Sequence, residues 1–164
     1  MSFTPTPIER ESAPREASPT ARQSLSASSV AFAIAGVLIA VCHLPTLGFG
    51  FLDWDDGIHV TQNPAVLAPE SVALREHLTT PALGYPIPIT IASYALEVRL
   101  LGIAPWHFHL LNVIAHLASC ALVFLLALRL RLTNLGALCA MLLFGLHPIV
   151  AEPVSWVTGR KDVL

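Results

Sequence analysis

Three apolar stretches limit what this chain can fold into. They cover about residues 29–47, 108–128 and 135–150. About 20 residues of helix cross the roughly 30 Å hydrocarbon layer of a membrane, so each stretch is close to one span in length. The composition agrees, because 54% of the residues are hydrophobic and only 12% are charged, about half the charged fraction of a soluble domain. We therefore predict an all-α membrane protein with about three transmembrane helices.

Charge and cysteine usage exclude other classes of protein. The formal net charge is −2, which is too weak and too mixed to predict a nucleic-acid partner. Cys42, Cys120 and Cys139 lie inside the apolar stretches. An odd number of cysteines without Cys-x-x-Cys spacing does not indicate a disulfide framework or a zinc site, and we predict no metal site from these residues.

The chain divides into a tail and a membrane domain. Residues 1–27 are rich in Pro, Ser, Thr and Ala, which predicts a disordered cytoplasmic tail. Residues 28–164 form the predicted transmembrane domain. Because the sequence stops in mid-pattern at Leu164, we expect the N-terminal portion of a longer multi-span bundle, truncated at 164 and inactive by itself.

A long connection, residues 48–107, follows the first predicted span. Its second half contains apolar residues at helical spacing: Ile91, Tyr94, Ala95, Val98 and Leu101. Glu97 and Arg99 lie in the same run and argue against a full span. We predict an amphipathic helix at about 88–101 that lies in the membrane interface.

The orientation follows from a short basic turn. Arg129 and Arg131 lie between the second and third predicted spans. Positive residues favour the cytoplasmic side, which places the turn 129–134 and the N-terminus in the cytoplasm. The connection 48–107 and the residues after 150 then face the outer side.

Under this topology, unusual polar residues from three segments meet at the outer face. They are Asp53, Trp54, Asp55 and Asp56 after the first span; His107, His109 and Asn112 at the start of the second; and His147, Glu152, Arg160, Lys161 and Asp162 after the third. Charge near the hydrocarbon is costly unless it is paired, hydrated or used. The acids could instead form a solvated loop that ends the first helix.

One helical stripe in the second span has two interpretations. His109, Asn112 and His116 are spaced i, i+3 and i+7, so they share one face of a helix. They could support a catalytic site, or they could form a hydrogen-bond ladder between helices.

This set of side chains suits the transfer of a sugar from a lipid phosphate. Such a reaction needs a carboxylate that takes the proton of the acceptor hydroxyl, cations that stabilise the leaving phosphate, and a groove for the lipid. Arg160 and Lys161 are natural phosphate partners. A divalent metal is possible, but the sequence indicates no ligand set for one.

The C-terminal residues HPIVAEPVSWVTGRKDVL resemble a known signature, His-Pro-x-x-x-Glu-x-Val-x-Trp-x-x-Gly-Arg-x-Asp-x-Leu. It belongs to the tetratricopeptide-containing transmembrane O-mannosyltransferase family and its bacterial relatives, which are membrane glycosyltransferases of the GT-C class. Three more segments are similar to family motifs in the same order: FLDWDDGIHVTQNPAV, GYPIPIT and WHFHLLNVIAHL.

The resemblance implies roles for individual residues. It makes Asp55 or Asp56 the catalytic carboxylate, and it places His147, Glu152, Arg160 and Asp162 around the donor phosphate or the acceptor. We add Lys161 to that group from its charge. Asp53, Trp54, His109, Asn112 and His116 are expected to support the site. The family often has an arginine where this chain has Ile87.

The implied function is transfer of a sugar, with mannose as the candidate, from a polyprenyl-phosphate carrier to a hydroxyl acceptor such as protein Ser or Thr. The implied partners are membrane lipid, the lipid-linked donor and a protein or glycan acceptor. The expected location is a bacterial inner membrane, or the endoplasmic reticulum of a eukaryote. A non-catalytic membrane module or degenerate relative is the alternative. A metal or proton pathway built from His109, His116, His147 and the aspartates is a third hypothesis.

Overall fold

The computed structural model describes residues 19–68 and 86–164, which form helices and no strand. Two helices are long, α1 (Pro19–His43) and α5 (Pro105–Arg129). Candidate membrane spans are Ala27–Gly48 and Pro105–Arg129, and a bent pair of helices gives up to one more. The predicted fold class, an all-α membrane protein with about three transmembrane helices, is confirmed.

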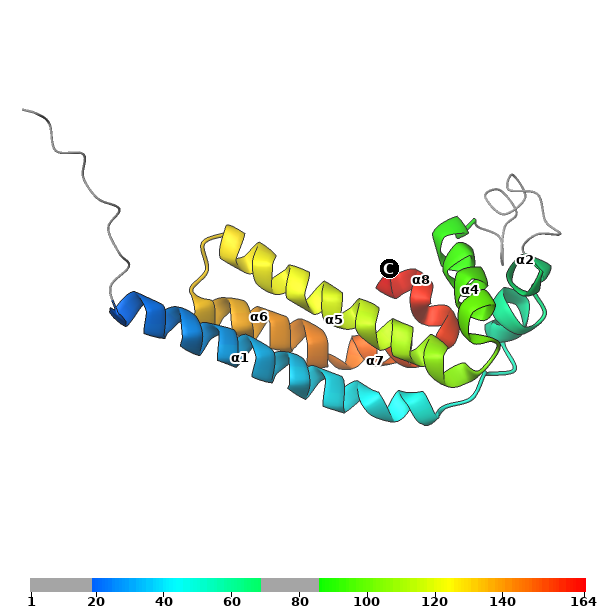
Figure 1. Cartoon of the computed structure of the whole chain (residues 1–164), viewed down its shortest axis with the longest axis horizontal. Helices are drawn as coiled ribbons and strands as arrows, with labels where there is room; N and C mark the ends of the chain where they lie inside the picture. Colours follow the sequence, from blue (N-terminus) through cyan, green and yellow to red (C-terminus); the bar gives the residue numbers. More distant parts are fainter. Residues whose placement is uncertain (1–18, 69–85) are drawn as a thin grey trace, which may run out of the picture.

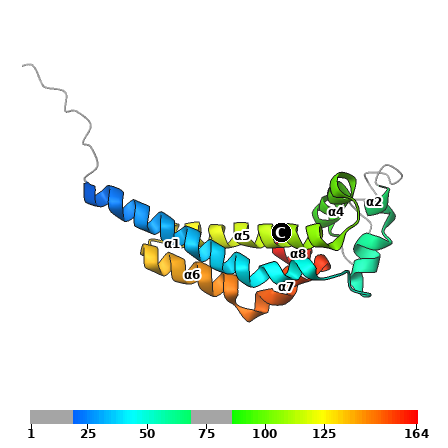
Figure 2. The ribbon, with the colours of Figure 1, turned by 60° about the horizontal axis from the view of Figure 1, so that its bottom comes forward.

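Three helices form the body of the molecule. α1, α5 and α6 (Asn134–Leu146) lie along one another (Figures 1 and 2). Their shared core includes Ile39 from α1, Phe124 from α5 and Met141 from α6. α6 begins where the hydroxyl of Thr133 accepts a hydrogen bond from the amide of Gly136 at 3.1 Å, which satisfies one free donor of the first turn.

The third predicted span, 135–150, is not one continuous helix. α6 ends at Leu146, and a short 3₁₀ turn, η4 (Pro148–Val150), leads into α7 (Ala151–Ser155). The two halves are bent by 47°. Pro148 explains the break, because proline has no amide hydrogen and disfavours helix at the residue before it.

Two histidines satisfy the carbonyl that this break leaves free. His43 of α1 and His116 of α5 each place Nε2 at 3.1 Å from the carbonyl oxygen of Gly145. Each imidazole therefore donates to the same oxygen, which has two lone pairs. A Cβ atom at Gly145 would lie 2.5 Å from Cδ1 of Ile39, so the three helices approach closely only because this residue is glycine.

The predicted tail, 1–27, differs in part from the structure. Residues 1–18 lie outside the described residues, but α1 begins at Pro19, so residues 19–27 are helical. Proline suits the first position of a helix, where its missing amide hydrogen is not needed. The Ala, Arg, Gln and Leu residues that follow favour helix.

Short helices gather toward one end of the body, which we call the α4 end (Figure 1). They are η1 (Leu44–Gly48), η2 (Gly57–Thr61), α2 (Pro64–Leu67), α4 (Pro88–Leu101), η5 (Val157–Gly159) and α8 (Arg160–Val163). A second core includes Val60, Ile91, Phe108 and Val157. α4 is the helix predicted at 88–101; its place in the membrane interface stays a prediction. Of the segment GYPIPIT, residues 84 and 85 lie outside the described residues.

Candidate functional site

The centre of the α4 end is the buried side chain of Arg160, which is 1% exposed. Its Nη1 donates to Oε2 of Glu97 at 2.6 Å, and its Nε donates to Oδ1 of Asn112 at 2.8 Å. Its Nη2 donates to the carbonyl oxygen of Phe108 at 2.9 Å. Arg160 thus ties the start of α8 to α4 and α5, and most of its donors are occupied within the protein.

Glu97 is held from two sides. Besides Arg160, it accepts a hydrogen bond at Oε1 from Nδ1 of His107 at 2.8 Å. Nε2 of His107 in turn accepts from the amide of Ala104 at 3.2 Å, which fixes the tautomer with the proton on Nδ1. Both carboxylate oxygens of Glu97 therefore have partners, as a buried charge requires.

Tyr94 completes this group of side chains, which, with Arg160, Glu97 and His107, we call the Arg160 cluster. Its ring lies 4.5 Å from the guanidinium carbon of Arg160, and its hydroxyl donates to the carbonyl of Val157 at 2.8 Å. Burial raises the pKa of Tyr94 well above its usual value, although the charge of Arg160 opposes the shift. The phenol therefore stays protonated and acts as a hydrogen-bond donor.

Asn112 and His116 both make bonds between helices. Nδ2 of Asn112 donates to the carbonyl of Trp156 at 2.8 Å, while Oδ1 accepts from Arg160. His116 contacts the carbonyl of Gly145 instead. These contacts fit the hydrogen-bond ladder that the stripe suggested, and they leave His116 in the body of the bundle, away from the Arg160 cluster.

Asp56 joins the two chain segments that were expected to form the site. It is fully buried, with Oδ2 accepting from the amide of Leu52 at 2.8 Å and Oδ1 from the amide of Thr158 at 3.2 Å. Thr158 is 102 residues later in the chain. The acidic segment, residues 53–56, is thereby held against the C-terminal segment, residues 156–162.

Asp55 is placed differently from Asp56. It is only partly buried, and within the described residues its carboxylate makes no hydrogen bond. Its backbone carbonyl accepts from Nδ1 of His59 at 2.9 Å. The backbone of Asp55 is therefore fixed while its carboxylate stays available. Asp53 and Trp54 are exposed, and Trp54 lies 6.2 Å from the ring of Trp156.

The remaining predicted residues lie at the surface or at the bend. Lys161 lies 5.7 Å from the Trp156 ring and pairs with Asp162 at 3.2 Å. Glu152 is exposed in the first turn of α7. His147 is also exposed, at the α6–α7 bend, where its Nδ1 accepts from the amide of Ile149 at 3.2 Å. No described contact joins His147 to the Arg160 cluster.

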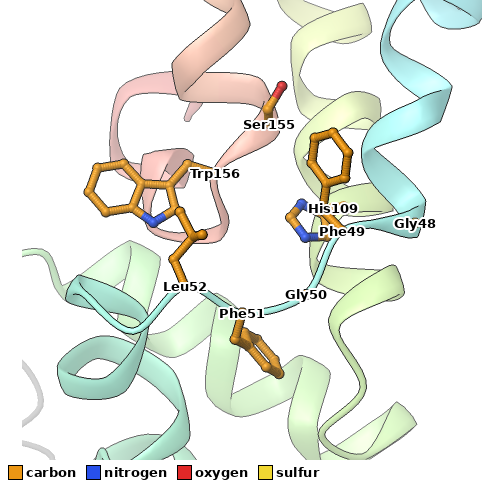
Figure 3. Close-up of a pocket in the computed structure, with 8 residues that line it drawn as sticks. All are labelled: Gly48, Phe49, Gly50, Phe51, Leu52, His109, Ser155 and Trp156. Carbon is orange, nitrogen blue, oxygen red and sulfur yellow. The ribbon is translucent and has the colours of Figure 1, made fainter.

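A hollow of about 420 Å³ lies between residues 48–52, which lead into the acidic segment, and Trp156. We call it the His109 hollow. Its lining residues are Gly48, Phe49, Gly50, Phe51, Leu52, His109, Ser155 and Trp156 (Figure 3). A second hollow beside it shares Phe49, Leu52, Ser155 and Trp156 and adds Trp54 and Glu152. His109 thus lines a cavity, whereas Asp55 lines neither of these two.

Sequence reasoning missed the role of Glu97. In the sequence, Glu97 argues against a full span, but a carboxylate within an apolar helix also indicates a buried partner. Tyr94, one turn earlier, belongs to the apolar pattern of the predicted helix, and that pattern gives no role to its hydroxyl. Within residues 19–68 and 86–164, no group of three or more His, Cys, Asp or Glu side chains is placed to hold a metal ion.

Comparison with known proteins identifies relatives. Protein O-mannosyl-transferase Tmtc1 of Drosophila melanogaster is 31% identical over 157 residues, which cover 87% of this chain and 18% of the relative. Protein O-mannosyl-transferase TMTC3 of Mus musculus is 31% identical over 137 residues, or 77% of this chain and 14% of the relative. The human TMTC3 protein is 39% identical over 77 residues, 47% of this chain and 8% of the relative.

The chain spans less than a fifth of the length of these curated relatives. No protein-family model matches it, and no solved structure gives a significant match. The resemblance predicted from four ordered segments is nevertheless confirmed by similarity over most of the chain. The protein is therefore a relative of the TMTC protein O-mannosyl-transferases and corresponds to one part of them.

Proposed function

We propose that this chain forms part of a membrane glycosyltransferase that moves a sugar, with mannose as the candidate, from a polyprenyl-phosphate carrier to a hydroxyl acceptor such as protein Ser or Thr. The names of its relatives support this class of reaction. The observation on which we rely most is the contact between Asp56 and the amide of Thr158. It holds the acidic segment and the C-terminal segment together, as a shared site would require.

In this proposal, Asp55 is the catalytic carboxylate and Asp56 positions it. Asp56 uses both oxygens within the protein, so it is poorly placed to take a proton from an acceptor. In the part of the chain that the structure describes, the Asp55 carboxylate accepts no hydrogen bond, while the Asp55 backbone carbonyl accepts one from His59. A general base must reach the hydroxyl proton directly, and a partly exposed carboxylate can do so.

The donor phosphate would meet Lys161 more readily than Arg160. The Lys161 side chain is 20% exposed, whereas Arg160 is buried with Glu97 and Asn112 as partners. Arg160 would then hold the C-terminal segment in place, and its buried charge would add positive electrostatic potential at the phosphate site. Glu152 and Asp162 are exposed and could contact the acceptor, while His147 would act only if other parts of the whole protein extend the site toward the bend.

The proposed setting is a multi-pass membrane protein with a cytoplasmic N-terminus, in a bacterial inner membrane or, for a eukaryote, in the endoplasmic reticulum. The candidate spans support membrane insertion. The Arg129 and Arg131 turn supports the orientation. The lipid-linked donor and the protein or glycan acceptor are parts of the proposal, and a divalent metal enters it only as a variable of the assay.

The test is a transfer assay with the full-length protein in proteoliposomes. Radiolabelled polyprenyl-phosphate mannose is the donor, a Ser/Thr-rich peptide is the acceptor, and each assay is run with Mg²⁺, with Mn²⁺ and with chelator. We expect Asp55→Asn to lower transfer about 10²- to 10⁴-fold, the usual contribution of a general base. The neighbouring variant Asp53→Asn, at an exposed residue for which only a supporting role is expected, should lose much less activity.

Full transfer by a double variant, Asp55→Asn with Asp56→Asn, would contradict the proposal. Absence of transfer by a well-folded wild-type protein with every donor sugar tested would instead favour the non-catalytic module.

A further inference from the structure

Among the described residues, two side chains of the His109 hollow have buried polar atoms without a hydrogen-bond partner. His109 is 1% exposed, and within the described residues neither of its ring nitrogens has a hydrogen-bond partner at good geometry, although the backbone carbonyls of Phe49, Gly50 and Ser155 lie near the ring. The indole nitrogen of Trp156 is also buried and unpartnered there. Buried polar groups are normally satisfied, so such a set beside a cavity needs an explanation.

The chemistry of the lining residues limits the kinds of ligand that the hollow can bind. A neutral imidazole offers one donor and one acceptor, and an indole N–H adds a donor. Hydroxyl groups can pair with each of these three groups, because a hydroxyl both donates and accepts. Of the eight lining residues, none has a charged carboxylate, ammonium or guanidinium group, so the hollow lacks the cations that a phosphate would require.

The size and the aromatic lining of the hollow also suit a small ligand that carries hydroxyl groups. Its volume of about 420 Å³ lies within the range of small-molecule sites. Phe49 and Trp156 provide aromatic surface, whereas Phe51 turns away from the hollow (Figure 3) to pack on Phe108. Aromatic rings pack against apolar faces while the polar groups at the edge fix orientation.

We propose that the His109 hollow binds a pyranose ring, with His109 and the indole N–H of Trp156 bonding its hydroxyls. This rests on the proposed function, since the ring would belong either to the lipid-linked donor or to a glycan on the acceptor. His109 is then a substrate-binding residue that sets sugar specificity, while Asp55 remains the carboxylate of the transfer step.

Access to His109 depends on Phe49. The Phe49 ring meets the imidazole edge-on, with centroids 6.2 Å apart, and both imidazole nitrogens are shielded. Phe49 is itself half-exposed. Because its ring covers the imidazole, the proposal requires Phe49 to move aside when the sugar ring enters.

The test measures binding without transfer. The full-length protein with Asp55→Asn, in nanodiscs, is titrated with methyl α-mannopyranoside, and saturation-transfer NMR reports contact with the sugar protons. Variants His109→Phe and Trp156→Phe keep a ring and remove the polar atoms. His109→Asn keeps a donor and an acceptor. Trp106→Phe, at an exposed tryptophan outside the hollow, is the matched control, and thermal melting checks that each variant folds.

We expect His109→Phe to weaken binding about five- to tenfold, the effect of losing one hydrogen bond, and Trp156→Phe to weaken it less. His109→Asn should restore part of the affinity, and Trp106→Phe should bind normally. Competition separates the sources of the ring. Displacement by polyprenyl-phosphate mannose but not by polyprenyl phosphate indicates the donor sugar, whereas displacement by a mannosylated peptide alone indicates an acceptor glycan.

Equal binding by wild type and a folded His109→Phe variant would overturn the inference. Displacement by inorganic phosphate as effective as by sugar would also overturn it. Either result can occur while Asp55-dependent transfer persists, so the inference can fail without the proposed function. Conversely, sugar binding that depends on His109 in a protein without transfer activity would reject the enzyme and keep the binding site.

Discussion

Arg160 donates a 2.6 Å hydrogen bond to Glu97, a residue 63 positions earlier in the chain. The side chains are 1% and 4% exposed, and the contact links α8 to α4 across the start of α5. Together with the bonds of Asp56, Asn112 and Tyr94, this contact fixes the C-terminal segment against α4 and α5. Loss of either partner leaves a buried charge without compensation.

Glu97→Gln should therefore destabilise the protein by about 3–5 kcal/mol, as expected when one partner of a buried ion pair is removed. Denaturant unfolding of the purified full-length protein in detergent, followed by tryptophan fluorescence, measures the change. Arg99→Gln is the control, because Arg99 is exposed on the same helix and should change stability by less than about 0.5 kcal/mol. A loss for Glu97→Gln no larger than that of the control would show that the pair is not closed.

Gly145→Ala should lower stability because its added methyl group has no space. The new Cβ would meet Cδ1 and Cγ1 of Ile39 at 2.5 and 2.8 Å and Sγ of Cys120 at 3.0 Å. Overpacking of this kind costs about 1–3 kcal/mol. The thermal midpoint of the detergent-solubilised protein is the measurement.

Gly136→Ala provides a control on the same helix. Its nearest neighbours would lie 3.5 Å away, an ordinary contact, and alanine favours helix over glycine by up to about 1 kcal/mol. This variant should match or exceed wild-type stability. The packing account fails if the two glycine variants melt at the same temperature.

Asp56→Asn should destabilise the α4 end more than Asp55→Asn does. Asp56 accepts from two backbone amides with different oxygens, and an asparagine would present an NH₂ group to one of them. A buried donor left without an acceptor costs about 1–3 kcal/mol. The carboxylate of Asp55 has no hydrogen bond in the described part of the chain, so its amide variant should unfold within about 0.5 kcal/mol of wild type.

Much of the fold could be predicted because hydrophobic periodicity and length are local properties. The two long helices follow from apolar stretches at 29–47 and 108–128, and α4 occupies the predicted residues 88–101. Pro148 also indicates the break at His147, since proline acts on its immediate neighbours. The helical start at Pro19 was missed because composition near a terminus does not show where a helix begins.

The pairings within the site could not be predicted, because they join residues far apart in the chain. Sequence spacing predicts that Arg160 lies at the outer face, but it does not predict that the side chain turns inward to Glu97. In the same way, two adjacent aspartates looked equivalent. Only the folded chain separates them: Asp56 accepts from the amide of Thr158, whereas across residues 19–68 and 86–164 the Asp55 carboxylate accepts no hydrogen bond. Charge alone does not distinguish a structural partner from a reactive one.

In the proposed topology, the acidic segment and the C-terminal segment share one side of the membrane, opposite the turn between α5 and α6. Single cysteines at the exposed positions Asp53, Asp162 and Thr133, in full-length protein lacking Cys42, Cys120 and Cys139, test it with an impermeant thiol reagent. We predict that Asp53→Cys and Asp162→Cys react from outside intact cells, and that Thr133→Cys reacts only after permeabilisation. Labelling of Asp162→Cys from the side opposite to Asp53→Cys would mean that the chain crosses the membrane once more between them, and the two segments could not form one site.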